Sequence, residues 1–418
     1  MIVRGIYSLA MLGAQPFLRR KLQRRGEAEP GYLDAVEERF GHYAGATEPG
    51  RLWIHAVSLG ETRAAAILVD ALRRQQPGLR LLLTHGTATG RAEGAKLLRE
   101  GDAQAWLPWD TPGAVQRFLN HFQPVAGVLM ETEMWPNLSA ACRGRGIPLA
   151  LANARLSGKS LAQTKTLSFL SRPAYAALAA VWAQTEGDAQ RLAQAGATVK
   201  GVFGNLKFDA APDAGQVARG QAWQAAADRP VVMFASSREG EEAAFLSALK
   251  SLPDPGAVQW LIVPRHPQRF DEVAALAGGQ GLSVSRRSGW TDSPQAAAIW
   301  IGDSLGEMPL YYGMAGAALL GGSFEPLGGQ NLIEAAACAC PVVMGPHTFN
   351  FAEAAELADA AGAARRVESL DEGVRVALNL MSDPPRRQRM SQAALAFAAA
   401  HRGAADKTAT AILSLVQR

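Results

Sequence analysis

From about residue 50 onward, short apolar runs alternate with longer stretches of helical periodicity. This alternation is typical of parallel sheets whose strands are joined by helices. In the first half, strands are predicted at Leu52–Val57, Leu81–Leu83, Val125–Met130, Leu149–Ala152, Val181–Ala183 and Val199–Val202. In the second half, they are predicted at Val231–Ala235, Trp260–Val263, Ala298–Ile301, Ala317–Leu320, Pro341–Met344 and Ala364–Val367. Helices are predicted at Thr62–Arg74, Arg91–Arg99, Glu239–Leu249, Gln268–Ala277, Leu332–Cys338 and Phe351–Ala358.

The two halves are separated by Asp209–Gln216, a segment of Asp, Ala, Pro, Gly and Gln. We therefore expect two doubly wound α/β domains, at residues 26–210 and 217–418. In open α/β sheets, ligands bind beyond the carboxyl ends of the strands. Functional residues are accordingly expected in loops that directly follow strands, with the two domains facing one another across a cleft.

The first 25 residues have a different character. Ile2, Ile6, Leu9 and Leu12 recur at helical spacing and form one apolar stripe. A basic cluster follows, made of Arg19, Arg20, Lys21, Arg24 and Arg25. The apolar part is shorter than the roughly 20 residues that a membrane span needs, and no small-residue cleavage site follows it. The pattern favours a helix that lies in an anionic membrane surface, over a helix packed on its own domain or a true span.

Composition narrows the class of protein. The chain has 418 residues, 48% of them hydrophobic and 19% charged, which indicates two or three ordinary globular domains and excludes disorder. With 42 basic and 38 acidic residues the net charge is only +4, and no basic patch suggests nucleic-acid binding. Cys142, Cys338 and Cys340 have neither zinc-ligand nor redox spacing. They indicate buried thiols in a reducing compartment.

The loops of the first half carry acids and cations directly after strands. Glu61 opens a predicted helix after Gly60, where the helix dipole favours a carboxylate and suits it to be a general base. Glu131 and Glu133 follow the strand that ends at Met130. Lys207 lies in a glycine-led loop at the junction of the two halves, where we expect a phosphate or carboxylate contact.

The loops of the second half are suited to binding an anion. Arg265 lies between prolines after a strand, and Gly302–Met308 again connects a strand to a helix. The segment Gly321–Glu334 contains four glycines and enters a helix near Asn331, so its backbone N–H groups can hold an anion. Its spacing matches neither a P-loop nor a dinucleotide-binding fingerprint.

Seven of these blocks together resemble the 3-deoxy-D-manno-octulosonic acid (Kdo) transferases of lipopolysaccharide synthesis. They occur in family order as HAVSLGE, ETEMWPN, NARLS, GNLKFD, PRHPQRF, GDSLGEM and GGSFEPLGGQNLIE. The resemblance implies a GT-B glycosyltransferase with two Rossmann-like domains and an N-terminal membrane-associated helix. It further implies inverting, metal-independent transfer without a cofactor, from CMP-Kdo to the lipid A precursor lipid IVA, at the cytoplasmic face of the inner membrane.

The family's functional positions transfer to this chain by motif. Glu61 corresponds to the catalytic base, and Glu131 and Lys207 to positions that stabilise the transition state. The CMP-binding positions are Pro264, Arg265, Gly306, Glu307, Met308, Asn331, Leu332, Ile333 and Glu334. The chain departs from the family in having Arg238 where relatives often have His, and in its weaker N-terminal apolar segment.

Other functions remain open from the residues alone. Another GT-B sugar-nucleotide enzyme, such as a UDP-sugar transferase or epimerase, is the main alternative, and titration with CMP and UDP distinguishes it. A non-enzymatic membrane scaffold leaves the acids after the strands unexplained. Binding to nucleic acid requires a basic face that the even distribution of charge does not provide.

Overall fold

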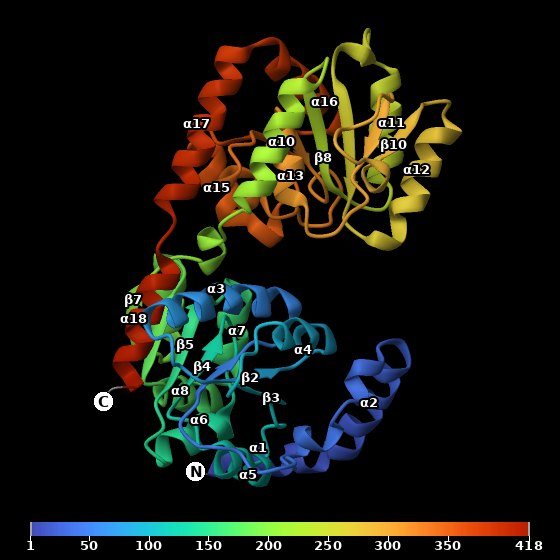
Figure 1. Ribbon diagram of the computed structural model, residues 1–418. Helices are drawn as coiled ribbons and strands as arrows, with labels where there is room; N and C mark the ends of the chain where they lie inside the picture. Colours follow the sequence, from blue (N-terminus) through green and yellow to red (C-terminus); the bar gives the residue numbers. More distant parts are fainter. Residues whose placement is uncertain (1, 417–418) are drawn as a thin grey trace. The chain divides into compact units, whose positions relative to one another are not determined.

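The computed structural model describes residues 2–416, which fold into two compact units (Figure 1). Unit 1 runs to Asp209 and takes up the chain again at Arg402, whereas unit 2 is Ala210–His401. The sequence analysis assigned everything after residue 217 to the second domain. The structure instead places the last helix, α18 (Ala404–Val416), in unit 1, beside α3 (Leu59–Gln75). Ala405, Ala409 and Ile412 of α18 complete the apolar core over α3, a contact that local sequence pattern does not reveal.

Unit 1 is built on a parallel sheet in the order β3-β2-β1-β4-β5-β6-β7. Its strands are β1 (Leu52–His55), β2 (Leu81–His85), β3 (Ala103–Trp106), β4 (Ala126–Met130), β5 (Leu149–Ala154), β6 (Ala180–Ala183) and β7 (Val199–Val202). Its further helices are α4 (Ala88–Ala95), α5 (Pro112–Phe122), α6 (Pro136–Gly144), α7 (Gly158–Thr166), α8 (Ser168–Ala176) and α9 (Glu186–Ala195). Short 3₁₀ turns lie at Pro30–Leu33, Val36–Phe40 and Leu206–Asp209.

Unit 2 repeats this plan with the order β10-β11-β9-β8-β12-β13-β14, again entirely parallel. Its strands are β8 (Val231–Ser237), β9 (Gln259–Pro264), β10 (Val284–Arg286), β11 (Ile299–Ile301), β12 (Ala317–Leu320), β13 (Val342–Met344) and β14 (Ala364–Arg366). Its helices are α10 (Ala214–Ala226), α11 (Glu241–Lys250), α12 (Phe270–Gly279), α13 (Met308–Met314), α14 (Leu332–Ala337), α15 (Ala352–Ala360), α16 (Leu370–Ser382) and α17 (Pro384–Ala400). Short 3₁₀ turns lie at Pro255–Ala257, Pro267–Arg269, Arg287–Gly289 and Phe349–Phe351.

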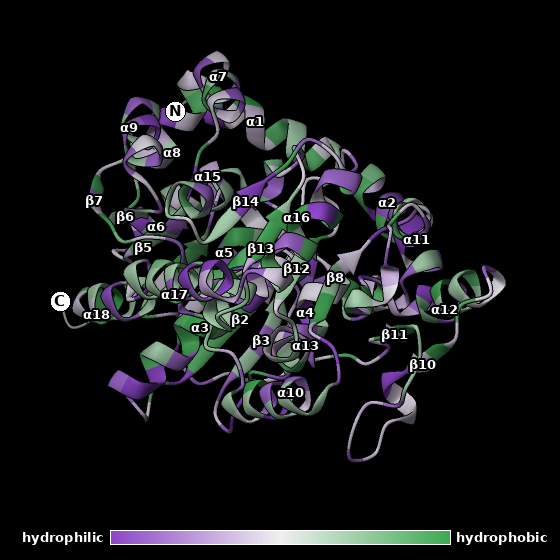
Figure 2. Cartoon of the chain, turned by 90° about the horizontal axis from the view of Figure 1, so that it is seen from above, coloured by the Kyte–Doolittle hydropathy of each residue, from purple (hydrophilic) through white to green (hydrophobic). Residues whose placement is uncertain are grey.

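The strands of both units are apolar because helices cover both faces of each sheet. In β1, Leu52 and Ile54 join the core under α3 and α18, whereas Trp53 joins the opposite core with Phe118 of α5. In unit 2, Figure 2 shows the hydrophobic colour along β8 and β12, whose residues are buried. Runs of apolar residues without alternation are expected for parallel strands buried on both faces.

The twelve strands predicted from sequence are confirmed, with ends that shift by a few residues. Two strands were missed, β3 and β10. Each is an edge strand with polar or half-exposed residues, so it lacks the apolar run that marks the central strands. The helix predicted at Arg91–Arg99 is displaced to Ala88–Ala95, because Thr87 caps its start by accepting a hydrogen bond from the backbone N–H of Gly90. The expected linker is shorter than Asp209–Gln216, because Asp213 caps α10.

The N-terminal segment forms α1 (Ile2–Gly13) and α2 (Gln15–Ala28). Helix α1 packs on α6 and α8 through a polar contact, in which the buried Ser8 hydroxyl donates to Asn137 Oδ1 at 3.1 Å. Its apolar residues face outward, with Ile2, Ile6 and Leu9 exposed by 82%, 63% and 71%. None of the helices within residues 2–416 is both long enough and apolar enough to cross a membrane.

Candidate functional site

Glu61 lies in the first turn of α3, directly beyond the carboxyl end of β1. Ser58 caps the helix, and its hydroxyl is 3.2 Å from Glu61 Oε1, while the N–H of Val57 donates to Oε2 at 2.8 Å. Ser58 and Glu61 thus form a capping box, in which the carboxylate in the first turn accepts a hydrogen bond from the backbone at the start of the helix. Burial raises the pKa of Glu61, Val57 opposes that rise, and the neighbouring Glu131 adds to it. A carboxylate with a raised pKa is a stronger base than one in water.

Glu131 lies beyond the carboxyl end of the neighbouring strand β4, and it is buried. Its φ of 58° places it in the left-handed region, which is rare for residues other than glycine and is enriched at functional sites. Its oxygens face two cations, Arg155 Nε at 3.1 Å and Lys207 Nζ at 3.8 Å. The structure therefore brings Glu131 and Lys207 together, as the sequence analysis placed both in loops after strands.

Lys207 is held there by Asn153, which lies near the end of β5 and begins the sequence NARLS. Asn153 is buried and is also in the left-handed region, with a φ of 52°. Its Oδ1 accepts a hydrogen bond from the backbone N–H of Leu206 at 3.1 Å. This bond fixes the 3₁₀ turn Leu206–Asp209 that carries Lys207.

The sequence analysis noted Glu133 but missed its pairing with His55 beside Glu61. His55, at the end of β1, places Nε2 3.9 Å from Oε2 of Glu133, which follows β4. Burial raises the pKa of Glu133 to about 7, with the charge of Glu61 as the second cause. Burial also lowers the pKa of His55 to about 3. The signal was present in the motifs HAVSLGE and ETEMWPN, but only the strand register places their side chains next to one another.

In unit 2, the predicted donor segments lie beyond the carboxyl ends of the central strands. Arg265 follows β9 and is exposed, and its backbone N–H donates to the carbonyl of Ser237 at 3.0 Å. Pro264 is buried as the last residue of β9. Glu307 pairs with Arg287 at 2.9 Å and also accepts from the Ser304 hydroxyl, so its carboxylate is fixed before α13 begins.

The glycine-rich segment reaches α14 as predicted. Asn331 caps this six-residue helix, with its Oδ1 accepting from the N–H of Ile333 at 3.1 Å. Leu332 and Ile333 are each 1% exposed, so their side chains pack in the core, and only their backbone is suited to contact a ligand. Glu334, Gly306 and Met308 are at least partly exposed.

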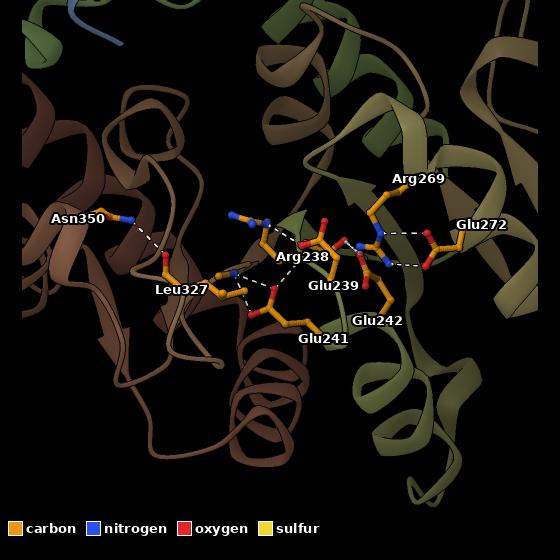
Figure 3. Close-up of polar contacts among 10 residues, drawn as sticks. Arg238, Glu239, Glu241, Glu242, Arg269, Glu272, Leu327 and Asn350 are labelled. Carbon is orange, nitrogen blue, oxygen red and sulfur yellow. Dashed lines mark hydrogen bonds and ion pairs between the residues drawn. The ribbon is translucent and has the colours of Figure 1, made fainter. Parts of the chain in front are cut away.

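Glu241 joins the glycine-rich segment to the loop that contains Arg238 (Figure 3). Its buried carboxylate accepts from the N–H of Gly322 at 2.8 Å and from the N–H of Arg238 at 2.9 Å. The Arg238 side chain pairs with Glu239 at 3.1 Å, and Figure 3 shows both beside Glu241. Behind them, Arg269 connects the buried Glu242 to Glu272. The Arg238 loop is therefore held in place by Glu241 whatever residue occupies position 238.

A search of residues 2–416 for clusters of three or more His, Cys, Asp or Glu side chains that could hold a metal ion finds none. Each of the two groups of residues contains cations of the protein itself beside its acids. They are Arg155 and Lys207 in unit 1, and Arg265 and Arg287 in unit 2.

Comparison with solved structures defines the class of fold. The chain resembles the UDP-GlcNAc 2-epimerase of Neisseria meningitidis with a TM-score of 0.57, at 14% identity over 88% of this chain and 99% of the other. It resembles a glycosyltransferase of Rickettsia africae with a TM-score of 0.56, at 12% identity over 88% and 99%. The fold is thus that of two-domain, Rossmann-like α/β proteins of the GT-B type.

Sequence comparison identifies the family. Residues 34–210 match the family model described as 3-deoxy-D-manno-octulosonic-acid transferase. The chain is 49% identical to the 3-deoxy-D-manno-octulosonic acid transferase of Bordetella pertussis, over 98% of both chains. It is 30% identical to that of Haemophilus influenzae, over 97% of this chain and 96% of the relative. The chain belongs to the 3-deoxy-D-manno-octulosonic acid transferase family and is a glycosyltransferase.

Proposed function

We propose that this enzyme transfers Kdo from CMP-Kdo to lipid IVA, with inversion and without a metal ion or cofactor, at the cytoplasmic face of the inner membrane. The observation that carries the proposal is the environment of Glu61. A half-buried carboxylate with a raised pKa, oriented by Val57 and Ser58, is suited to remove the proton from an acceptor hydroxyl. The family membership supports Kdo as the sugar transferred.

Glu131 and Lys207 are proposed to act beside this base. Arg155 and Lys207 both face the Glu131 carboxylate, which holds Lys207 in a half-buried position. A preorganised cation stabilises negative charge that develops in a transition state, because it needs no reorganisation when the reaction occurs. We therefore assign Lys207 to transition-state stabilisation and Glu131 to holding it in place.

Unit 2 is proposed to bind the CMP moiety of the donor. Arg265 is an exposed guanidinium on a loop anchored to the Ser237 carbonyl, which suits a phosphate contact. The backbone around Asn331 and Glu334, and the segment Gly306–Met308, supply further donors and acceptors. A leaving phosphate stabilised by fixed cations requires no metal, and activity that is unchanged in EDTA is the expected result.

Membrane attachment is proposed for α1 and α2, with α8 packed beside α1. Residues 1–26 contain six Lys or Arg and no acid, and residues 134–185, which include α6, α7 and α8, repeat that composition. The apolar side chains Ile2, Ile6, Leu9, Phe17, Leu167 and Phe169 are all more than half exposed. Exposed apolar residues among cations are suited to an anionic lipid surface.

Three experiments test these assignments. Incubation of the purified protein with CMP-Kdo and a tetra-acylated lipid A precursor should add Kdo, detected by product mass, and calorimetry should show binding of CMP but not of UDP. Washing membranes that carry the protein with high salt and then carbonate should release it, because salt screens charges at a surface. Release only by detergent would contradict surface attachment. Absence of Kdo in the product, or preference for UDP, would contradict the proposed reaction.

A further inference from the structure

The pair Glu133 and His55 lies behind the candidate base and has no role in the reaction described above. His55 is 1% exposed, and among the described residues its Nε2 atom has no hydrogen-bond partner. The Oε2 atom of Glu133 lies 3.9 Å from Nε2. This distance is longer than a hydrogen bond. A rotation of the Glu133 carboxyl group, whose side chain is 20% exposed, would close it.

The tautomer of His55 follows from its other ring nitrogen. Nδ1 lies 3.1 Å from the carbonyl oxygen of Thr84, which can only accept a hydrogen bond. It also lies 2.9 Å from the Thr84 hydroxyl oxygen, which accepts from the indole N–H of Trp53 at 2.8 Å. Nδ1 therefore carries the hydrogen, and Nε2 presents a lone pair toward Glu133. A lone pair is a suitable partner for a protonated carboxyl group and a poor one for a carboxylate.

The two acids differ in what stabilises their ionised forms. Glu61 receives the Val57 N–H and the Ser58 hydroxyl, and it lies at the N-terminus of α3. These donors and the helix dipole favour its charged form. For Glu133, the Trp135 side chain favours the charged form, but burial and the charge of Glu61 outweigh it, and Glu133 also faces the unprotonated nitrogen of a neutral imidazole. When two buried acids interact, the proton settles on the one whose charge is less well stabilised.

The other titratable groups around Glu133 agree with this assignment. Glu61 of α3 raises the pKa of Glu133, and Glu133 in turn adds to the raised pKa of Tyr175 on α8. Glu131, two residues earlier, is paired with Arg155 and Lys207, so these two cations are directed to Glu131. His85 of β2 is buried, and burial lowers its pKa to about 4, so it is neutral at the pH of the cell.

We propose that Glu61 and Glu133 share one proton, which resides on Glu133 and points to Nε2 of His55, so that Glu61 remains an ionised base at neutral pH. Glu133 is then a positioning residue that acts through Glu61. The inference rests on the proposed role of Glu61, but the proton distribution itself does not depend on which sugar or acceptor the enzyme uses.

Carboxyl titration tests the shared proton directly. The full chain is labelled with glutamate carrying ¹³C at the carboxyl carbon, and the Glu133 signal is assigned by its loss in Glu133→Gln. This signal should titrate near pH 7 in the unmodified protein, and at least one pH unit lower in Glu61→Gln, because the neighbouring charge is removed. As a control, Glu186→Gln in the exposed first turn of α9 should leave the titration unchanged. An ordinary glutamic acid pKa of about 4.3 for Glu133, or one insensitive to Glu61→Gln, would overturn the proposal.

Two further measurements distinguish this proposal from the proposed function. In ¹⁵N spectra, His55 should show a protonated Nδ1 and an unprotonated Nε2 below pH 7, and the opposite tautomer would contradict it. In transfer assays with the unmodified protein, the KM for a phosphate-bearing acceptor should rise several-fold above pH 7. In Glu133→Gln, this KM should not change with pH, while kcat should still fall at acidic pH. Identical profiles for both proteins would overturn it. If no Kdo is transferred at any pH, the proposed function fails, while the carboxyl titration still decides the proton.

Discussion

The two units share one topology but build their functional loops from different materials. In unit 1, the loops after β1 and β4 present the half-buried acids Glu61 and Glu133, whose pKa values burial raises, and the buried Glu131, whose backbone is left-handed. In unit 2, the loops after β8, β9 and β12 present glycines and the exposed guanidinium of Arg265, and the buried acid there, Glu241, accepts from the N–H groups of Arg238 and Gly322. Burial raises the pKa of a carboxylate and so makes it a stronger base. Fixed charges and backbone dipoles, by contrast, stabilise an anion without any change of protonation. Unit 1 is thus suited to proton transfer, and unit 2 to binding an anion.

The largest effect is expected for the base in unit 1. Glu61→Gln should reduce turnover by about two to four orders of magnitude, the usual contribution of a general base, and leave CMP-Kdo affinity unchanged in calorimetry. Glu186→Gln serves as the matched control, since Glu186 also lies in the first turn of a helix but is exposed. If Glu61→Gln keeps more than about a tenth of the activity, another residue accepts the proton.

Removing one cation from each unit should separate catalysis from donor binding. Lys207→Ala is expected to lower kcat by about 10²-fold, because it removes preorganised charge, with little change in donor affinity. Arg265→Ala is expected to weaken CMP binding by a similar factor. Neither should change the free energy of unfolding by more than about 1 kcal/mol, since both side chains are partly exposed. Large destabilisation with normal donor binding would show a structural role.

The raised pKa of Glu133 predicts that the stability of unit 1 depends on pH. Its folded pKa of about 7 lies above its unfolded value, so the folded state binds more protons between about pH 4.5 and 7. Stability from this group is therefore present below pH 4.5 and falls by up to about 3 kcal/mol as the pH rises to 7. Denaturant unfolding at pH 5 and 8 should show this loss, which Glu133→Gln should lack. If the free energy of unfolding changes equally with pH in both proteins, the prediction is wrong.

A smaller effect on stability is expected for Glu241 in unit 2, whose carboxylate holds two loops in place. Glu241→Ala should reduce stability by about 1–3 kcal/mol, because the N–H groups of Gly322 and Arg238 lose their acceptor. Donor affinity should fall with it, as both loops are released. Glu239→Ala provides the control, because Glu239 pairs with Arg238 at the surface and such pairs contribute about 0–1 kcal/mol. Unchanged donor affinity in Glu241→Ala would show that these loops do not bind it.

The two α/β units, their central strands and most of the loops that carry chemistry can be predicted from the amino-acid sequence alone. These are local properties, because a strand buried on both faces must be a continuous apolar run and a helix cap must be a short polar side chain. Glu61, Glu131 and Lys207 could be singled out because each follows such a run. The family motifs also singled out Leu332 and Ile333, although their side chains pack in the core.

The tertiary structure alone decided which of these loops are neighbours and what surrounds each charge. Only the pairing of β1 with β4 places His55 beside Glu133, although 78 positions separate them in the sequence. Only packing shows that α18 returns to unit 1, and that α1 buries Ser8 and exposes its apolar stripe. The edge strands β3 and β10 likewise become strands through their neighbours. Burial, and with it the pKa of a buried acid, depends on contacts between distant segments, which no local pattern encodes.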